Sequence, residues 1–117
     1  AKILDYKLFK NQNVVKVTTK EKLNNSNFLE ASNFSREILE QDKNIYHHLG
    51  IYCFQKKTLK NFVSYEQSPN EIKNKLEQLR ALDNGIKINI ALAKSSPIGV
   101  DTMEDYIAIK KIMEYKN

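Results

Sequence analysis

Residues 68–90, SPNEIKNKLEQLRALDNGIKINI, contain the clearest helix and strand signals of the chain. The letters SPNE at 68–71 place a hydroxyl at a helix N-cap, proline at the first helical position and glutamate at the third. Apolar residues then recur on one helical face as far as Leu82, and Gly85 is typical of the residue that ends a helix. The alternating pattern of 86–93 predicts a strand directly afterwards. The segment therefore predicts one helix followed by one strand.

Further elements are predicted on both sides of this segment. Residues 14–19 are β-branched and predict a strand, and 46–55 predict a second, mostly buried strand that would place Cys53 in the core. Two more helices are predicted at 57–65 and 102–115, the second opened by a capping box. The order of strands and helices predicts an α/β protein with a mixed sheet flanked by helices.

Length and composition fit a single unit, residues 1–117, with enough apolar content for a core. The longest apolar run is only a few residues, far below the roughly 20 that span a bilayer, and the N-terminal residues lack a signal-peptide pattern. From these features we expect neither a membrane protein nor a secretory signal. The single cysteine, Cys53, excludes a disulfide framework and a multi-cysteine zinc site, and favours a cytoplasmic location.

The formal net charge of +5 comes from 19 basic residues, of which only Arg36 and Arg80 are arginines. The lysines are spread along the chain, and no Gly-rich phosphate loop or helix-turn-helix spacing accompanies them. The net charge is therefore interpreted first as a feature that favours solubility. A basic nucleic-acid-binding domain remains an alternative that rests on net charge alone.

The stretch 46–52, YHHLGIY, is the most unusual in the chain. On a strand, adjacent side chains point to opposite faces, so His47 and His48 cannot share one ligand. His48 and Tyr52 would point the same way, about 13 Å apart at ~3.3 Å per residue. They could line one long pocket. The alternative is a surface histidine beside a half-buried tyrosine.

Four other polar residues are candidates for a site. Glu77 and Gln78 lie at the edge of the apolar helix face, where they either face a polyhydroxylated ligand or form a solvated flank. Asp101 precedes a helix, where it is either a local cap or a ligand for a hard cation such as Mg²⁺. Arg36 offers a planar fork that suits carboxylates and phosphates.

A series of short motifs resembles, in order and spacing, the C-terminal half of the CMP-KDO synthetase family, the 3-deoxy-manno-octulosonate (KDO) cytidylyltransferases. The resemblance extends from about residue 8 to residue 115. The motifs are NVVKV at 13–17, FSR at 34–36, HLGIY at 48–52, SP at 68–69, KLEQLR at 75–80, NGIKI at 84–88 and GVDTMED at 99–105.

The resemblance implies a partial nucleotide-diphospho-sugar transferase-like fold. It also implies cytidylyl transfer from CTP to KDO with release of pyrophosphate, dependent on Mg²⁺, for lipopolysaccharide biosynthesis. A homodimer is expected, and neither nucleic acid nor membrane is an expected partner. By motif match, the implied substrate-binding residues are Arg36, His48, Tyr52, Glu77 and Gln78, and the implied metal ligand is Asp101.

The family's N-terminal half, which grips the triphosphate of CTP, has no counterpart in these residues, and Met103 replaces a usual proline. The chain is therefore expected to carry the sugar-binding and dimerisation half, with no catalytic residue beyond the metal ligand, and to be inactive alone. Two alternatives stay open. One is a cytidylyltransferase for another acidic sugar, and the other is a non-enzymatic module that binds a sugar or a partner.

Overall fold

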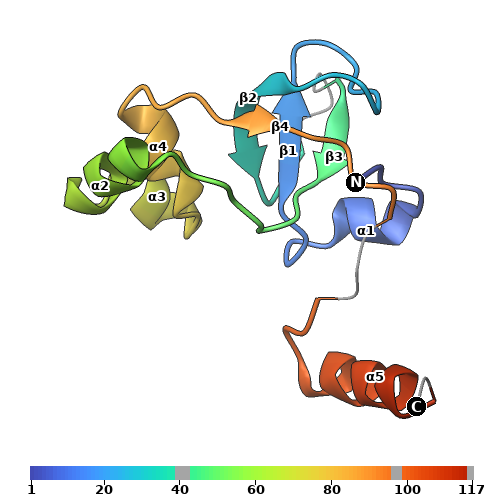
Figure 1. The fold of residues 1–117 in the computed structure, drawn as a ribbon. Coiled ribbons are helices and arrows are strands. Elements are labelled where there is room, and N and C mark those ends of the chain that lie inside the picture. Colours follow the sequence, from blue (N-terminus) through green and yellow to red (C-terminus); the bar gives the residue numbers. More distant parts are fainter. Residues whose placement is uncertain (39–42, 96–98, 116–117) are drawn as a thin grey trace.

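The computed structural model describes residues 1–38, 43–95 and 99–115. Four strands form one sheet with the order β3-β1-β2-β4, and helices α2, α3 and α4 lie together on one side of it (Figure 1). The elements are α1 (Tyr6–Lys10), β1 (Lys16–Thr19), β2 (Leu29–Ser35), β3 (Ile45–His47), α2 (Lys56–Ser64), α3 (Pro69–Asn74), α4 (Gln78–Asp83), β4 (Asn89–Ile90) and α5 (Met103–Glu114).

Strand β1 is central and pairs antiparallel with both β2 and β3, while β2 pairs antiparallel with β4. Across the described residues every strand pair is antiparallel, so the prediction of a mixed sheet is corrected there, whereas the α/β class is confirmed. The register places Val17 opposite Phe34 on one side and Tyr46 on the other. These three side chains therefore share one face of the sheet.

That face carries the core. Val17, Phe34 and Tyr46 are buried together with Leu76 and Leu79, which come from the helical side. The hydroxyl of Tyr46 accepts a hydrogen bond of 2.8 Å from the backbone N–H of another core residue, in the loop between β1 and β2. A buried phenol with a partner is the usual arrangement, and here it closes this loop over the core.

The helix predicted from 69 to 84 is in fact two helices. Its capping box is confirmed, because the side chain of Ser68 caps the Glu71 N–H and Glu71 bonds back to Ser68. Lys75 then adopts a left-handed conformation with φ of 53° and ends α3. Gly85, with φ of +74°, follows α4 as predicted. The break redirects the chain so that α4 can pack against β2.

The strand predicted at 46–55 is largely wrong. β3 ends at His47, and the residues from 48 to 55 form no strand. Cys53 is exposed rather than in the core, and Ile51 is 86% exposed. This apolar run crosses from the sheet to the helices, and Phe54 packs against Phe62 of α2 with ring centroids 5.8 Å apart.

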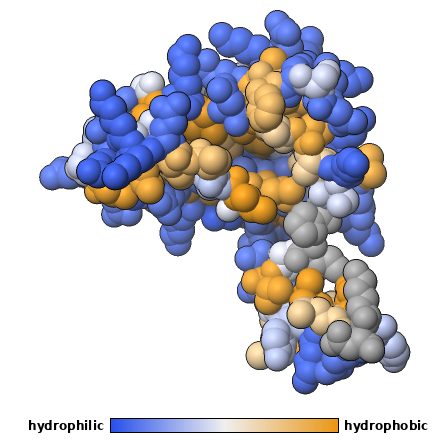
Figure 2. Space-filling model, viewed as in Figure 1, coloured by the Kyte–Doolittle hydropathy of each residue, from blue (hydrophilic) through white to orange (hydrophobic). Residues whose placement is uncertain are grey.

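Helix α5 confirms the second predicted capping box, formed by Thr102 and Asp105. Figure 1 shows α5 apart from the sheet, and none of its side chains is buried. Figure 2 shows hydrophobic side chains exposed on α5 and across the middle of the same face. Among the described residues, no helix is both long enough and apolar enough to cross a membrane.

Candidate functional site

His48 and Tyr52 are in direct contact. The Tyr52 hydroxyl lies 2.7 Å from His48 Nε2, which corrects the extended separation predicted from strand geometry. The chain turns between them, where the N–H of Ile51 donates to the Leu49 carbonyl at 2.8 Å. The imidazole of His48 also packs edge-on against Phe34, with centroids 5.1 Å apart. The sheet core therefore holds this pair in place.

The pair is uncharged near neutral pH. Burial lowers the pKa of His48 to about 4, helped by the positive charge of His47. Burial raises the pKa of Tyr52 to about 12, and the nearby carboxylate of Glu77 adds to that shift. The Nε2 of a neutral imidazole can accept a hydrogen bond from the phenolic O–H. This side of the site thus offers neutral hydrogen-bonding groups beside one carboxylate.

A row of aromatic rings continues from this pair to the helices. Tyr52 lies next to Phe54, with centroids 6.1 Å apart, and Phe54 leads to Phe62. The guanidinium of Arg80 lies 5.0 Å above the Phe62 ring, a cation–π distance. The row connects the end of β3 with α2 and α4, so the two sides of the site are packed as one unit.

Arg80 in turn holds α3 and α4 together. Its Nε and Nη2 donate to the two carboxylate oxygens of Glu71 at 2.7 and 2.6 Å. Hydrogen bonds from Arg80, Gln67 and the Ser68 backbone lower the pKa of Glu71 to about 2. The sequence indicated only the capping role of Glu71. Its pairing with Arg80 depends on the break at Lys75, which no local pattern signalled.

Glu77 and Gln78 stand at the start of α4. Glu77 is exposed, and together with Gln67, Glu71 and Lys75 it lines a hollow of about 340 Å³. The Nε2 of Gln78 is buried, and in the described part of the chain it has no hydrogen-bond partner. A buried donor without an acceptor is costly, so an oxygen-rich ligand would relieve it.

Arg36 follows β2 and reaches the same corner. Its Nε and Nη2 donate to the carbonyls of Asn74 and Lys75, each at 3.3 Å, and its Nη1 donates to the Gln12 carbonyl at 3.2 Å. These carbonyls include those at the end of α3, which lack helical donors. Arg36 is therefore tied to the turn that leads to Glu77.

Asp101 lies apart from these residues, next to α5. Its backbone N–H donates to the carboxylate of Asp105 at 3.2 Å, and Asp101 itself is exposed. Across the described ranges, no three residues of the His, Cys, Asp and Glu types gather in a way that could hold a metal ion. The chain offers Asp101 as one oxygen ligand, which suits Mg²⁺ only if substrate or other oxygens complete the shell.

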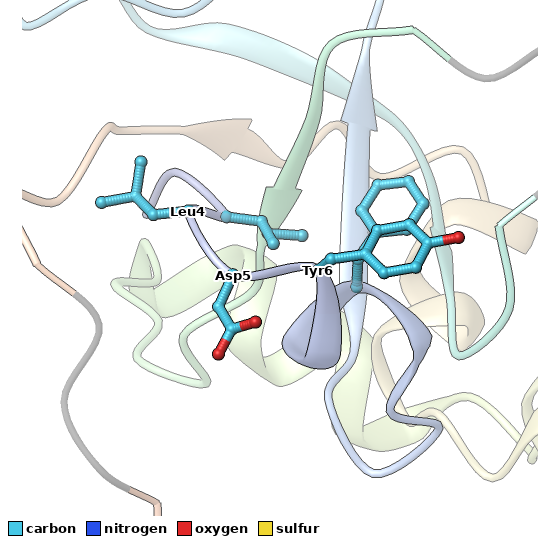
Figure 3. Close-up of a pocket in the computed structure, with 5 residues that line it drawn as sticks. Leu4, Asp5 and Tyr6 are labelled. Atoms are coloured by element: carbon cyan, nitrogen blue, oxygen red, sulfur yellow. The ribbon is translucent and has the colours of Figure 1, made fainter.

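A further hollow of about 230 Å³ lies beside α1 and is lined by Leu4, Asp5 and Tyr6 among others (Figure 3). Leu4 is 91% exposed, and the lining is largely apolar. None of the predicted site residues lines this hollow. The candidate site is instead the corner formed by Arg36, His48, Tyr52, Glu77 and Gln78.

The fold is similar to that of a solved CMP:2-keto-3-deoxy-manno-octonic acid synthetase complexed with CTP. The TM-score is 0.75 at 26% identity, over 97% of this chain and 47% of that chain. The chain therefore has part of a nucleotide-sugar transferase fold, as the motifs predicted. No family model matches the chain.

Curated relatives narrow the class. The chain is 43% identical over 72 residues to the 3-deoxy-manno-octulosonate cytidylyltransferase of Bartonella tribocorum, covering 62% of this chain and 30% of that protein. It is 40% identical over 96 residues to the enzyme of the same name from Brucella ovis, covering 81% of this chain and 38% of that protein. The resemblance is thereby confirmed, and this chain is homologous to part of a CMP-KDO synthetase.

Proposed function

We propose that residues 1–117 form a single unit, the C-terminal, sugar-binding part of a CMP-KDO synthetase. The complete enzyme would transfer the cytidylyl group of CTP to KDO for lipopolysaccharide biosynthesis. The anomeric hydroxyl oxygen of KDO would bond to the α-phosphorus as pyrophosphate leaves. One observation carries the sugar assignment: the hydrogen-bonded His48–Tyr52 pair lies close enough to Glu77 for that carboxylate to shift the pKa of the phenol.

The chemistry of this corner suits an anionic, hydroxyl-rich sugar. The neutral pair of His48 and Tyr52 can donate to or accept from sugar hydroxyls, and Glu77 can accept from them. The Nε2 of Gln78, which has no hydrogen-bond partner among the described residues, would supply a donor. Arg36 has five N–H donors. Since its described bonds to carbonyls use three of them, the others can meet the carboxylate of KDO.

For the reaction, these residues would bind and orient the sugar so that its anomeric hydroxyl meets CTP in line with the leaving group. Asp101 would supply one carboxylate oxygen to Mg²⁺, with substrate oxygens among the other ligands. When bound, Mg²⁺ would neutralise the charge that develops on the phosphate oxygens. No other group in this chain is assigned a catalytic role.

Replacing Glu77 with alanine in the natural polypeptide is expected to weaken KDO binding by roughly 10- to 100-fold, since a hydrogen bond to a charged group contributes about 1.5–3 kcal/mol. The affinity for CTP should change less than about twofold. Isothermal titration calorimetry with each substrate measures both. Glu66→Ala, an exposed glutamate on the segment before α3, is the matched control and should bind KDO normally. Equal losses for both substrates, or a wild type that ignores KDO, would refute the sugar-side assignment.

Replacing Asp101 with asparagine is expected to lower Mg²⁺-dependent turnover by at least about 100-fold, because a metal ion supplies several kcal/mol of charge stabilisation. Circular dichroism should show an intact fold, since Asp101 is exposed. Pyrophosphate release measures turnover, and the 117 residues alone serve as the blank. Near-normal turnover of the variant would remove Asp101 from the metal site.

We further propose that the enzyme is a cytoplasmic homodimer. The exposed apolar side chains of α5, which include Met103, Ile107 and Met113, support a protein interface. Sedimentation equilibrium of the natural polypeptide tests the dimer, and a monomer mass at micromolar concentration would contradict it. Cell fractionation tests the location, and recovery in a membrane or secreted fraction would contradict it.

A further inference from the structure

Lys16 is a buried cation with no acidic partner among the residues that the structure describes. It is 1% exposed, in the central strand β1. Its Nζ donates to two backbone carbonyls, those of Asn11 at 2.6 Å and Arg36 at 2.8 Å. Within residues 1–38, 43–95 and 99–115, no carboxylate forms an ion pair with it. Lysine is almost never buried to this degree unless it is paired.

The burial of Lys16 is unfavourable on electrostatic grounds. Desolvation lowers the pKa of its ammonium, and the positive charge of Arg36 lowers it further. An apolar side chain of similar length would fill the same space without that cost. What an apolar residue cannot supply is the donation to the carbonyls on either side.

Those two bonds join segments that the sequence separates. Asn11 caps the end of α1, and Arg36 directly follows β2. Arg36 extends the connection, because its guanidinium donates to the carbonyls of Asn74 and Lys75. Lys75 is the left-handed residue that ends α3.

This series of hydrogen bonds reaches the proposed sugar contacts. Glu77 and Gln78 come two and three residues after Lys75, so the direction in which they leave α3 depends on how that turn is held. Arg36 is the described side chain that bonds to both carbonyls of the turn. Lys16 in turn donates to the backbone carbonyl of Arg36, and so limits where the guanidinium can lie.

We propose that Lys16 is a positioning residue for the sugar site: by holding the Arg36 carbonyl against the end of α1, it fixes Arg36 and hence the turn at Lys75 that presents Glu77 and Gln78. Lys16 does not touch the sugar. The identity of the ligand as KDO rests on the proposed function, whereas the link from Lys16 to Arg36 and the turn rests on the hydrogen bonds alone.

The test is Lys16→Met in the natural polypeptide. Methionine keeps most of the apolar stem and removes every donor. KDO binding, measured by titration calorimetry, is expected to weaken about 10-fold, the effect of a loss of about 1.4 kcal/mol. The KM for CTP and kcat at saturating KDO should change less than about twofold. In ¹⁵N NMR the Arg36 Nε–H signal should shift or broaden, because its environment is no longer held.

Two further variants keep the experiment decisive. Lys16→Gln retains one donor group and is expected to recover part of the KDO affinity and of the Arg36 signal. Lys87→Met is the matched control, since Lys87 is exposed and pairs only loosely with Glu30 at 3.4 Å. That variant should behave as wild type in every measurement.

The inference is overturned if Lys16→Met binds KDO as wild type does and leaves the Arg36 signal unchanged. It is also overturned if affinity for CTP falls as much as that for KDO, because such a loss would indicate general destabilisation. If the wild type itself does not bind KDO, the proposed function fails. The Arg36 signal then decides the positioning link separately: a changed signal in Lys16→Met supports it, and an unchanged one refutes it.

Discussion

Replacing Phe34 with alanine is expected to lower the free energy of unfolding by about 3–5 kcal/mol, the usual loss when a buried phenylalanine is truncated. Phe34 is 2% exposed and lies opposite Val17 in the centre of the sheet. Its ring also packs against His48, so the cavity would open directly beneath the candidate site. Urea or guanidinium unfolding followed by circular dichroism measures the change.

Phe28→Ala is the matched control for this prediction. Phe28 immediately precedes β2, the strand that contains Phe34, but it is 72% exposed. Its truncation should change the unfolding free energy by less than about 0.5 kcal/mol, as for most surface positions. Similar losses for the two variants would mean that β2 does not present Phe34 to the core.

Replacing Glu71 with glutamine is expected to be the most damaging single change at the helical corner. The Glu71 carboxylate accepts from two Arg80 nitrogens and from the Ser68 backbone, whereas the glutamine amide is neutral and has only one acceptor oxygen. The substitution therefore leaves a largely buried guanidinium without its counter-charge. The melting temperature near neutral pH should fall by several degrees. Glu66→Gln, an exposed neighbour, is the control and should melt as wild type.

Glu71 also makes the stability of the folded protein depend on pH. The pKa of Glu71 is lowered from 4.5 to about 2 in the folded protein. In the unfolded chain the carboxyl binds its proton near the ordinary value, so the unfolded state holds more protons between these two pH values. The stabilisation by Glu71 is therefore complete above about pH 4.5 and is lost as the pH falls towards 2. The melting temperatures of wild type and Glu71→Gln should converge over that interval, and a constant difference would contradict the assignment.

Much of the local structure could be predicted from the sequence. The capping boxes at Ser68 and Thr102 occur where the residue pattern places them, and Gly85 follows a helix in the left-handed conformation. The predicted strand at 14–19 contains β1. These signals are reliable because a cap or a turn depends on residues three or four positions apart, whose interactions form in any context.

The wrong predictions concern segments whose structure depends on contacts between residues far apart in the sequence. Lys75 interrupts a helix whose apolar spacing continues across it, because the tertiary packing of α4 on β2 outweighs local propensity. The apolar run that contains Cys53 satisfies a strand pattern, yet it leaves the sheet and packs along Phe62. Neither β2 nor α1 was predicted from the sequence. The formation of β2 depends on its pairing with β1 and β4, because strand propensity depends on context.

For the candidate site, sequence motifs predict Arg36, His48, Tyr52, Glu77 and Gln78, and the chemical character of each side chain follows from its type alone. How these residues meet depends on contacts between distant segments. The contact of His48 with Tyr52, the Glu71–Arg80 pair and the bonds of Lys16 all require a particular packing of sheet against helices. A sequence specifies which groups can donate, accept or carry charge, whereas burial and distance, which set their pKa values and partners, arise only when the chain closes its core.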